Sequence, residues 1–268
     1  SMGGILSSTN SCKKNMDETK ENGENMVFKV KLAELVIGVK CLYGETRDFC
    51  REYLTDEESQ DFHVVISSKD IEAERKLATA SSDKERDAGL YSCEYLECLA
   101  LMRKIADHLP EHNCFLMHGA VISVQGDGYL FTAPSGTGKS THVNLWKKHI
   151  DGVKIINGDK PFLRVTDHGI WAYGTPWAGK EGWQKNEGVL LKGICLLMRG
   201  KENRVSMPVQ EQVLPFLIRQ IYYTDNPEMA GKTLELLDQA MKQIYFYEVS
   251  CNVSKEAALC CYDGVRGM

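Results

Sequence analysis

Short runs of apolar residues separated by polar turns dominate the first part of the chain, and this pattern is typical of β-strands. Residues 26–44 predict two strands joined by a turn, and residues 61–67 predict a third. From residue 92 to residue 113 the apolar positions follow helical spacing instead, so we expect a helix that stops near Pro110. Residues 26–114 are therefore expected to form an accessory α+β region.

The pattern changes after residue 114. Two apolar runs flank the sequence Gly126-Asp127-Gly128 and predict a β-hairpin. The second run leads directly into a loop of small residues, SGTGKST (135–141), which a helix is expected to follow. Further strands and helices are expected up to a last helix that begins at Lys255. We therefore expect residues 115–268 to form a second domain and the fold class to be mixed α/β.

The composition narrows the class of protein. The chain has 268 residues, of which 43% are hydrophobic, enough for a sizeable core. Residues 1–25 are polar and lack periodicity, which is typical of a flexible tail. The formal net charge of -5 argues against a nucleic-acid partner. No stretch reaches the roughly 18 apolar residues that a membrane span needs, so no membrane association is expected.

Cysteine usage indicates the cellular compartment. The ten cysteines are scattered, many of them in apolar runs, and none forms a C-x-x-C pair. Zinc binding is therefore not expected. Reduced thiols in a cytoplasmic protein are the expectation, because disulfide scaffolds are usually much shorter chains.

The loop at residues 135–141 has the residue types that bind phosphate. Glycines allow successive backbone N–H groups to turn inward, and the start of the following helix adds further N–H groups and its positive dipole end. A lysine supplies positive charge for β- and γ-phosphate oxygens, and a serine hydroxyl can bind Mg²⁺. Ala133 stands where the usual G-x-x-x-x-G-K-[ST] pattern has its first glycine, and a simple glycine turn before a helix is the alternative. The predicted phosphate-binding residues are Ser135, Gly136, Thr137, Gly138, Lys139, Ser140 and Thr141.

Two further residues are candidates for the same site. Asp159 follows the apolar run 153–156 and could reach the loop from the end of a neighbouring strand, where it would bind Mg²⁺ together with Ser140. The alternative is an ordinary turn aspartate. His118 precedes the first strand of the hairpin and could orient a carboxylate or an incoming hydroxyl, unless it is only packed or solvated. His142, inside the helix after the loop, is expected to be structural.

The segment 173–186 is rich in glycine and contains two tryptophans. Such a segment could be a mobile flap that closes over phosphate, with Lys180 as an anion clamp. The alternative is a structural loop whose lysines are solvated. Lys180 is therefore the third candidate catalytic residue, beside His118 and Asp159.

Residues 115–200 resemble the catalytic core shared by HPr kinase/phosphorylase and phosphoenolpyruvate carboxykinase, and more narrowly the small bacterial HPr-kinase-like proteins. The sequences HGAVISVQGDGYLFTAPSGTGKST and NGDKP carry this resemblance. It implies a P-loop core with a mixed sheet, ATP, Mg²⁺, and phosphoryl transfer to a hydroxyl of a protein, a peptide or a small alcohol. It also implies an active-site role for His118, since His118-Gly119 matches the family's His-Gly position.

The resemblance has one departure that affects function. The family usually has two consecutive aspartates where this chain has Gly158-Asp159, so His118 becomes the candidate for the missing acid–base group. A nucleotide-binding regulator with a degenerate site is one alternative function. A carboxykinase that acts on oxaloacetate is another, disfavoured by the short chain. The resemblance is also compatible with a homo-oligomer, because related kinases often form hexamers.

Overall fold

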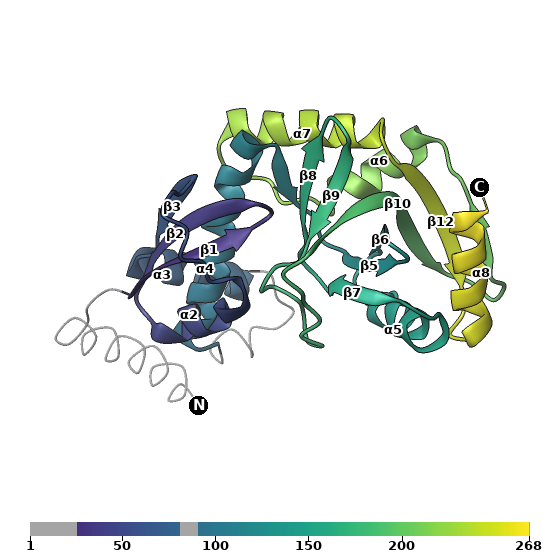
Figure 1. The fold of residues 1–268 in the computed structure, drawn as a ribbon, viewed down its shortest axis with the longest axis horizontal. Coiled ribbons are helices and arrows are strands. Elements are labelled where there is room, and N and C mark those ends of the chain that lie inside the picture. The colour runs from purple at the N-terminus through teal and green to yellow at the C-terminus, as the bar shows by residue number, and fades with distance from the viewer. Residues whose placement is uncertain (1–25, 81–90, 268) are drawn as a thin grey trace. The chain divides into compact units, whose positions relative to one another are not determined.

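The computed structural model describes residues 26–80 and 91–267. The chain divides into two compact units, residues 1–105 and residues 106–268, and each has its own sheet (Figure 1). The flexible tail expected at residues 1–25 lies outside the described residues. Among the described helices, none is long and apolar enough to cross a membrane.

The sheet of the first unit has three strands. β1 (Met26–Leu32) and β2 (Leu35–Cys41) form an antiparallel hairpin, and β3 (Phe62–Val65) pairs in parallel with β2. The hairpin turn consists of Ala33 and Glu34, both with positive φ (50° and 64°), the geometry of a two-residue turn that matches strand twist. The structure thus confirms the three strands predicted for this region.

A buried carboxylate links one helix of this unit to the segment that follows β2. Glu97 is fully buried and accepts hydrogen bonds from the backbone N–H groups of Leu42 and Tyr43 at 2.6 and 3.1 Å. Burial raises the pKa of Glu97, and these bonds only partly oppose that rise. The bonds attach the helix that contains Glu97 to the segment that follows β2. The helices are α2 (Gly44–Phe49), the short 3₁₀ helix η1 (Arg51–Tyr53), α3 (Ser68–Ala80) and α4 (Cys93–His108).

The described part of the second unit contains one mixed sheet of nine strands. Seven of them follow the order β4-β8-β9-β10-β6-β5-β7, while β12 pairs with β10 and β11. A 3₁₀ turn, η3 (Leu109–His112), precedes the sheet. The strands are β4 (Cys114–Leu116), β5 (Ala120–Val124), β6 (Asp127–Thr132), β7 (Lys154–Asn157), β8 (Phe162–Thr166), β9 (Gly169–Tyr173), β10 (Gly188–Arg199), β11 (Arg204–Ser206) and β12 (Tyr245–Cys251).

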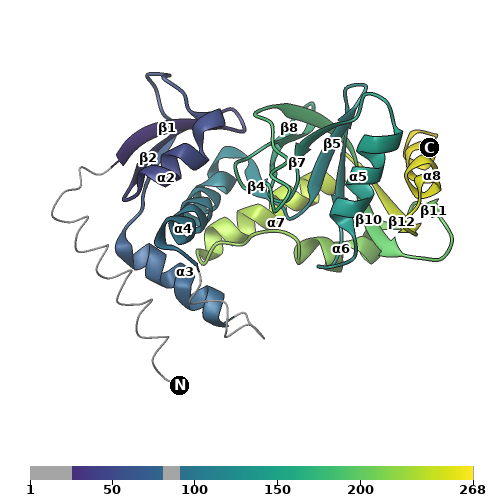
Figure 2. The ribbon, with the colours of Figure 1, turned by 90° about the horizontal axis from the view of Figure 1, so that it is seen from below.

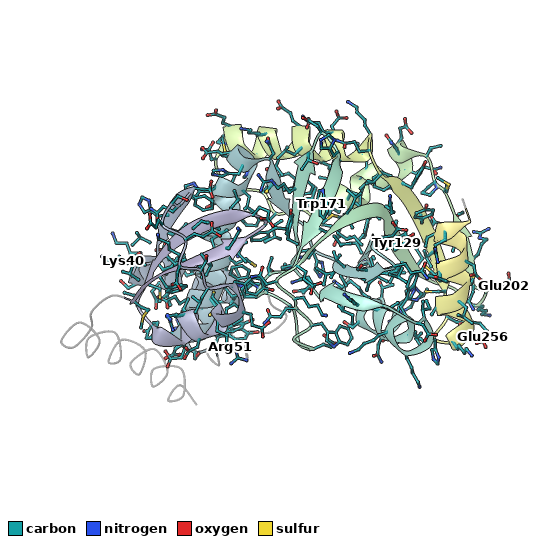
Figure 3. All side chains as sticks on the ribbon, viewed as in Figure 1. Lys40, Arg51, Tyr129, Trp171, Glu202 and Glu256 are labelled. Atoms are coloured by element: carbon teal, nitrogen blue, oxygen red, sulfur yellow. The ribbon has the colours of Figure 1, made fainter. Side chains whose placement is uncertain are left out.

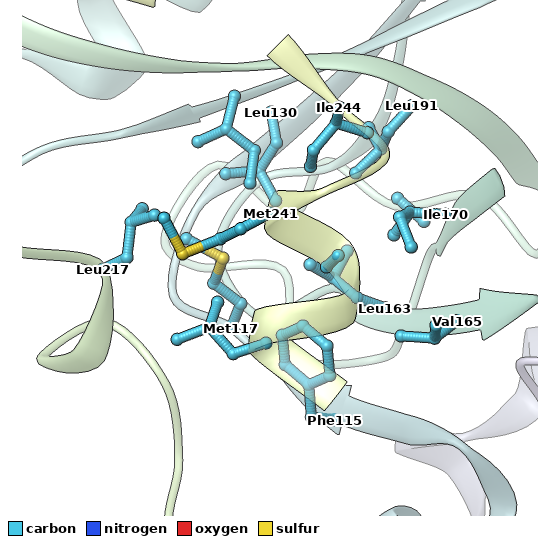
Figure 4. Packing of buried hydrophobic residues seen from close by; sticks show 14 of the residues in the cluster. Phe115, Met117, Leu130, Leu163, Val165, Ile170, Leu191, Leu217, Met241 and Ile244 are labelled. Atoms are coloured by element: carbon cyan, nitrogen blue, oxygen red, sulfur yellow. The ribbon is translucent and has the colours of Figure 1, made fainter. Parts of the chain in front are cut away.

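Helices cover both faces of this sheet, which explains why nearly every residue of the central strands β5 and β6 is buried. α5 (Lys139–His149) and α8 (Lys255–Arg266) lie on one face, and α6 (Gln210–Ile218) and α7 (Pro227–Met241) lie on the other (Figures 1 and 2). Neighbouring residues of β6 point to opposite faces. Leu130 packs in the α6/α7 core (Figure 4), whereas Tyr129 and Phe131 pack in the α5/α8 core.

Surface and interior side chains separate as expected for a folded domain. Glu202 and Glu256 extend outward, while Tyr129 lies inside (Figure 3).

Of the described cysteines, Cys93 is disulfide-bonded, so the expectation of reduced thiols throughout is wrong at this position. The free cysteines are Cys41, Cys50, Cys98, Cys114, Cys195, Cys251, Cys260 and Cys261.

Strand direction brings distant parts of the second unit to one edge of its sheet. β6 is parallel to β10, and β10 is parallel to β12. β5 runs antiparallel to both β6 and β7. The ends of β6, β7, β10 and β12 and the start of β5 therefore lie at the same edge.

Candidate active site

The segment between β6 and α5, which we call the glycine loop (residues 133–138), has the backbone geometry of an anion nest. Gly136 and Gly138 have φ values of 75° and 112°, a left-handed conformation that residues with a Cβ rarely adopt. Gly138 is the N-cap of α5, so the first N–H groups of that helix lack intrahelical acceptors and face the loop. The local sequence therefore builds a concave set of donors at the end of β6.

The structure brings the predicted site residues together. A cavity of about 440 Å³, which we call the Lys139 cavity, lies over the glycine loop and is shared by residues from the loop, the start of β5, the end of β7 and the segment after β9. Its lining includes His118, Ser135, Gly136, Thr137, Gly138, Lys139, Ser140, Thr141, Asp159 and Lys180.

Three of these side chains meet at short distances. His118 Nε2 lies 2.8 Å from Lys139 Nζ and 3.0 Å from Asp159 Oδ1. Lys139 Nζ is 3.7 Å from the same carboxylate oxygen, and Lys160 Nζ is 3.8 Å from Asp159 Oδ2. Backbone hydrogen bonds fix this arrangement, since Gly119 N–H donates to the Asp159 carbonyl at 2.9 Å.

Partial burial sets the charges of this group. Burial lowers the pKa of Lys139, and the nearby Asp159 only partly opposes that effect. Burial also raises the pKa of Asp159, but the contact with His118 and the positive charges of Lys160 and Lys139 outweigh it and lower the pKa overall. Asp159 is therefore an ionised carboxylate near neutral pH, while Lys139 is an under-solvated cation that an anion would stabilise.

The turn that presents Asp159 depends on a buried asparagine that the sequence analysis did not single out. Asn157 is fully buried, and its Oδ1 accepts from the N–H groups of Asp159 (3.0 Å) and Lys160 (2.8 Å). Its amide nitrogen donates to the Thr175 carbonyl at 3.0 Å. An asparagine two residues before a candidate ligand is a recognised turn signal, so Asn157 could have been found from sequence.

Gln220 is a second residue that the sequence analysis missed. Its backbone carbonyl accepts from His118 N–H at 2.7 Å, and its Oε1 lies 3.2 Å from His118 Nδ1. α6 stops at Ile218, and the chain then turns toward His118. Since an amide oxygen only accepts, His118 carries its proton on Nδ1 and presents Nε2 to the cavity.

Gly158 stands where the resemblance implies an aspartate, and the structure leaves no room for a side chain at this position. A Cβ on Gly158 would lie 2.5 Å from the Ala178 carbonyl oxygen, and Gly158 N–H donates to the Trp183 carbonyl at 2.9 Å. The segment after β9 thus packs where a side chain would be. Gly158→Asp therefore cannot be interpreted as a simple restoration of the family pattern.

The segment 173–186 is anchored at its ends and has an exposed turn at its centre. Trp177 and Ala178 are buried, and hydrogen bonds tie the segment to β7 and to the turn after it, including Lys160 N–H to the Trp177 carbonyl at 3.1 Å. Residues 179–182 form an exposed turn closed by a bond from Gly182 N–H to the Gly179 carbonyl. The ends of the segment are therefore anchored, as in the structural-loop alternative, while Lys180 at the turn lines the cavity.

Arg199 at the end of β10 braces the glycine loop from outside. Its guanidinium donates to the Gly136 carbonyl and, at 3.3 Å, to the Thr137 carbonyl. These bonds hold the two carbonyls outward, so that the N–H groups of the loop can face the cavity. The sequence gives no local signal for this role, because the residues are 62 and 63 positions apart.

We expect Arg199→Ala to weaken nucleotide binding by about fivefold, the effect of losing exposed hydrogen bonds that order a binding loop. The dissociation constant of Mg-ATP, measured by calorimetry, checks this. Arg204→Ala on β11 removes the same charge from an exposed position away from the loop and should change nothing. Equal affinity of both variants would show that Arg199 does not order the loop.

The residues present fit a magnesium ion. Asp159 and Ser140 line one cavity with the glycine loop, and Mg²⁺ in phosphate-binding sites is usually held by one or two carboxylates, substrate phosphates and water. Among the described residues, no group of three or more His, Cys, Asp and Glu side chains could hold a metal by itself. The fit is therefore to a metal that binds together with phosphate.

Comparison with known proteins finds only a distant structural likeness. No family model matches the chain, and no curated protein matches it significantly. Among solved structures, the chain is similar to the Hpr(Ser) kinase/phosphatase from Coxiella burnetii, with 12% sequence identity and a TM-score of 0.34 over 57% of this chain and 88% of that chain.

Proposed function

We propose that the protein is an ATP-dependent kinase that transfers the γ-phosphoryl group to a hydroxyl, with Mg²⁺ as cofactor and residues 115–268 as the catalytic domain. The convergence of Lys139, His118 and Asp159 at the glycine loop carries this proposal. It combines a cation, an acceptor nitrogen and a carboxylate within 3.7 Å of one another. Phosphoryl transfer needs this combination, because its catalysis is mostly positioning and charge neutralisation.

Binding of the phosphate chain follows from the loop. The backbone N–H groups of residues 135–140 would hold the β- and γ-phosphates, and Lys139 would move from His118 and Asp159 onto their oxygens. Asp159 and Ser140 would hold Mg²⁺, which neutralises charge on the phosphates when it is bound. Lys180, on the exposed turn, would contact the transferred group or the acceptor.

The chemical step needs a base for the acceptor. A bond forms between the acceptor oxygen and the γ-phosphorus, the bond to the bridging oxygen breaks, and its electron pair leaves with ADP. The hydroxyl proton passes to His118 Nε2, which faces the cavity and becomes accessible when Lys139 turns to phosphate. We give this role to His118 because a side chain at position 158 would clash with the Ala178 carbonyl, so a second carboxylate cannot stand at that position.

A direct test of this proposal is to detect the two products of phosphoryl transfer. The protein is incubated with Mg-ATP and either a serine-containing peptide mixture or a panel of small alcohols, and ³¹P NMR detects ADP and any new phosphate ester. We expect ADP together with a phosphate ester in at least one acceptor set, and neither in His118→Ala. ATP consumption that His118→Ala leaves unchanged would contradict the proposed mechanism.

The lack of room for a side chain at Gly158 also supports a second function, a nucleotide-binding regulator. If Gly158 reflects the loss of catalysis rather than its transfer to His118, the protein binds Mg-ATP but does not turn it over. Tight binding with no ADP formation in any acceptor set would favour the regulator. No observation favours the carboxykinase alternative over these two.

Gln220 gives a prediction about pH. Gln220→Glu places a carboxylate beside His118 Nδ1, and a neighbouring negative charge favours the protonated imidazole. Because a base must be deprotonated to accept a proton, the acidic limb of the kcat/KM profile should move to higher pH, whereas nucleotide affinity should stay constant. The measurement is ATP hydrolysis, with water as acceptor, from pH 5 to pH 9.

A matched variant separates this effect from a general change of charge. Gln212 is exposed on α6, so Gln212→Glu adds the same charge without contacting His118. Its pH profile should overlay that of the unmodified protein. Identical shifts in both variants, or none in Gln220→Glu, would refute a positioning role for Gln220.

A further inference from the structure

A second cavity adjoins the glycine loop. It measures about 480 Å³, within the range of small-molecule sites, and we call it the His142 cavity. Gly136, Thr137, Gly138 and Thr141 line both this cavity and the Lys139 cavity. A ligand bound on the loop could therefore extend from one cavity into the other.

Sheet topology explains where this cavity lies. β10 and β12 are parallel to β6 and end at the same edge, so Arg199 and residues 251–253 arrive beside the loop. α5 supplies the remaining wall through His142 and Leu145. Val253 is 78% exposed at the rim. The cavity is thus formed by parts of the chain that lie more than 100 positions apart.

His142 leaves one hydrogen-bonding atom unused. The residue is 3% exposed, and its Nε2 accepts from Trp146 Nε1 at 3.0 Å. Burial lowers the pKa of His142 to about 4, so the ring is neutral near pH 7 and carries its proton on Nδ1. Within the described part of the chain, no group accepts from Nδ1. A buried donor without a partner is uncommon and indicates a bonding partner that the protein itself does not supply.

Two other polar side chains of this cavity, Asn252 and Arg199, already have partners. Asn252 Nδ2 donates to the Lys201 carbonyl at 3.2 Å, and Asn252 Oδ1 accepts from Ser254. The guanidinium of Arg199 donates to carbonyls of the loop. The remaining polar groups are uncharged and lie beside the apolar side chains of Leu145 and Val253. They are the Nδ1–H of His142, the hydroxyls of Thr137 and Thr141 and the thiol of Cys251. Such a lining suits an uncharged heterocycle and sugar better than a second anion.

We propose that the His142 cavity binds the nucleoside part of the nucleotide, with His142 Nδ1–H donating to an acceptor atom on its base or ribose. This inference rests on the proposed function, because it assumes that the glycine loop holds the phosphates. Leu145 and Val253 contact the base, and the phosphate chain passes Thr141 on its way to Lys139. The nucleoside is thereby a determinant of affinity, and a phosphate chain alone binds less tightly.

The test compares Mg-ATP with Mg-tripolyphosphate, which has the phosphates without the nucleoside. His142→Leu and His142→Asn have similar shapes, and both remove the acceptor of Trp146, but only asparagine has a donor near the position of Nδ1. We expect His142→Leu to weaken Mg-ATP binding about tenfold and to change Mg-tripolyphosphate binding less than twofold. His142→Asn should recover most of the Mg-ATP affinity. If both variants bind Mg-ATP as tightly as the unmodified protein, the inference is wrong.

A rim variant keeps the test decisive if a change at buried His142 prevents folding. Val253→Trp fills the cavity from its exposed side and should weaken Mg-ATP binding selectively. Val209→Trp, at another exposed position, is the matched control. Equal losses for both ligands in Val253→Trp, or no loss for either, would overturn the inference while leaving the proposed function intact. If the unmodified protein binds neither ligand, the proposed function fails, and the inference fails with it.

Discussion

Replacing Lys139 with alanine is expected to weaken Mg-ATP binding roughly 100-fold, because its partly buried ammonium would make charge-assisted hydrogen bonds to phosphate oxygens. Burial lowers the pKa of Lys139, so the folded protein gains little from this charge until an anion joins it. The variant should therefore fold normally. Isothermal calorimetry gives the affinity, and thermal melting checks the fold.

The control for this prediction lies on the same helix. Lys148 is exposed near the end of α5 and is not part of the cavity lining. Lys148→Ala makes the same chemical change and the same change in net charge, so its affinity should match that of the unmodified protein. A loss of similar size in both variants would mean that general electrostatic attraction, and not the Lys139 site, holds the nucleotide.

Asp159→Asn is expected to abolish the dependence of nucleotide binding on Mg²⁺ and to lower turnover about 100-fold. The amide keeps the size of the side chain and the backbone bond to Gly119, but it is a poor ligand for a hard cation. Titrations of ATP with and without MgCl₂ test the first effect, and ADP formation tests the second. Retention of the Mg²⁺ dependence would remove Asp159 from the metal site.

Asp167→Asn provides the comparison for this variant. Asp167 lies in the exposed turn between β8 and β9, away from the glycine loop. The same loss of one negative charge there should leave binding and turnover unchanged. A matching loss in Asp167→Asn would trace the effect of Asp159→Asn to net charge and not to metal binding.

The sequence predicted the parts of the site that depend on local chemistry. The glycines before Lys139, the strand before them and the helix after them form one continuous signal, since each reflects a backbone requirement of its own position. Asp159 was found because carboxylates at strand ends commonly face such loops. These inferences needed only the neighbouring residues, and the structure places these residues around one cavity.

The other contacts of the site depend on which strands become neighbours in the sheet. No local sequence pattern predicts this arrangement. Gln220 contacts His118 across 102 positions, and Arg199 reaches Gly136 across 63. His142 was expected to be structural because its place in the helix shows only that it is buried. Its unused Nδ1 emerges only once β10 and β12 have built the second cavity beside it. The anchoring of the segment after β9 likewise follows from the packing of Ala178 on Gly158.

The central claim is that the glycine loop and Lys139 bind the phosphates of a nucleoside triphosphate. The most direct measurement is a calorimetric titration of the protein with Mg-ATP and Mg-GTP, paired with thermal melting at saturating nucleotide. We expect saturable heat for at least one nucleotide with a dissociation constant below about 1 mM, and a rise in melting temperature of about 5 °C at 100 times that concentration. Neither heat nor protection from melting with either nucleotide would contradict the claim.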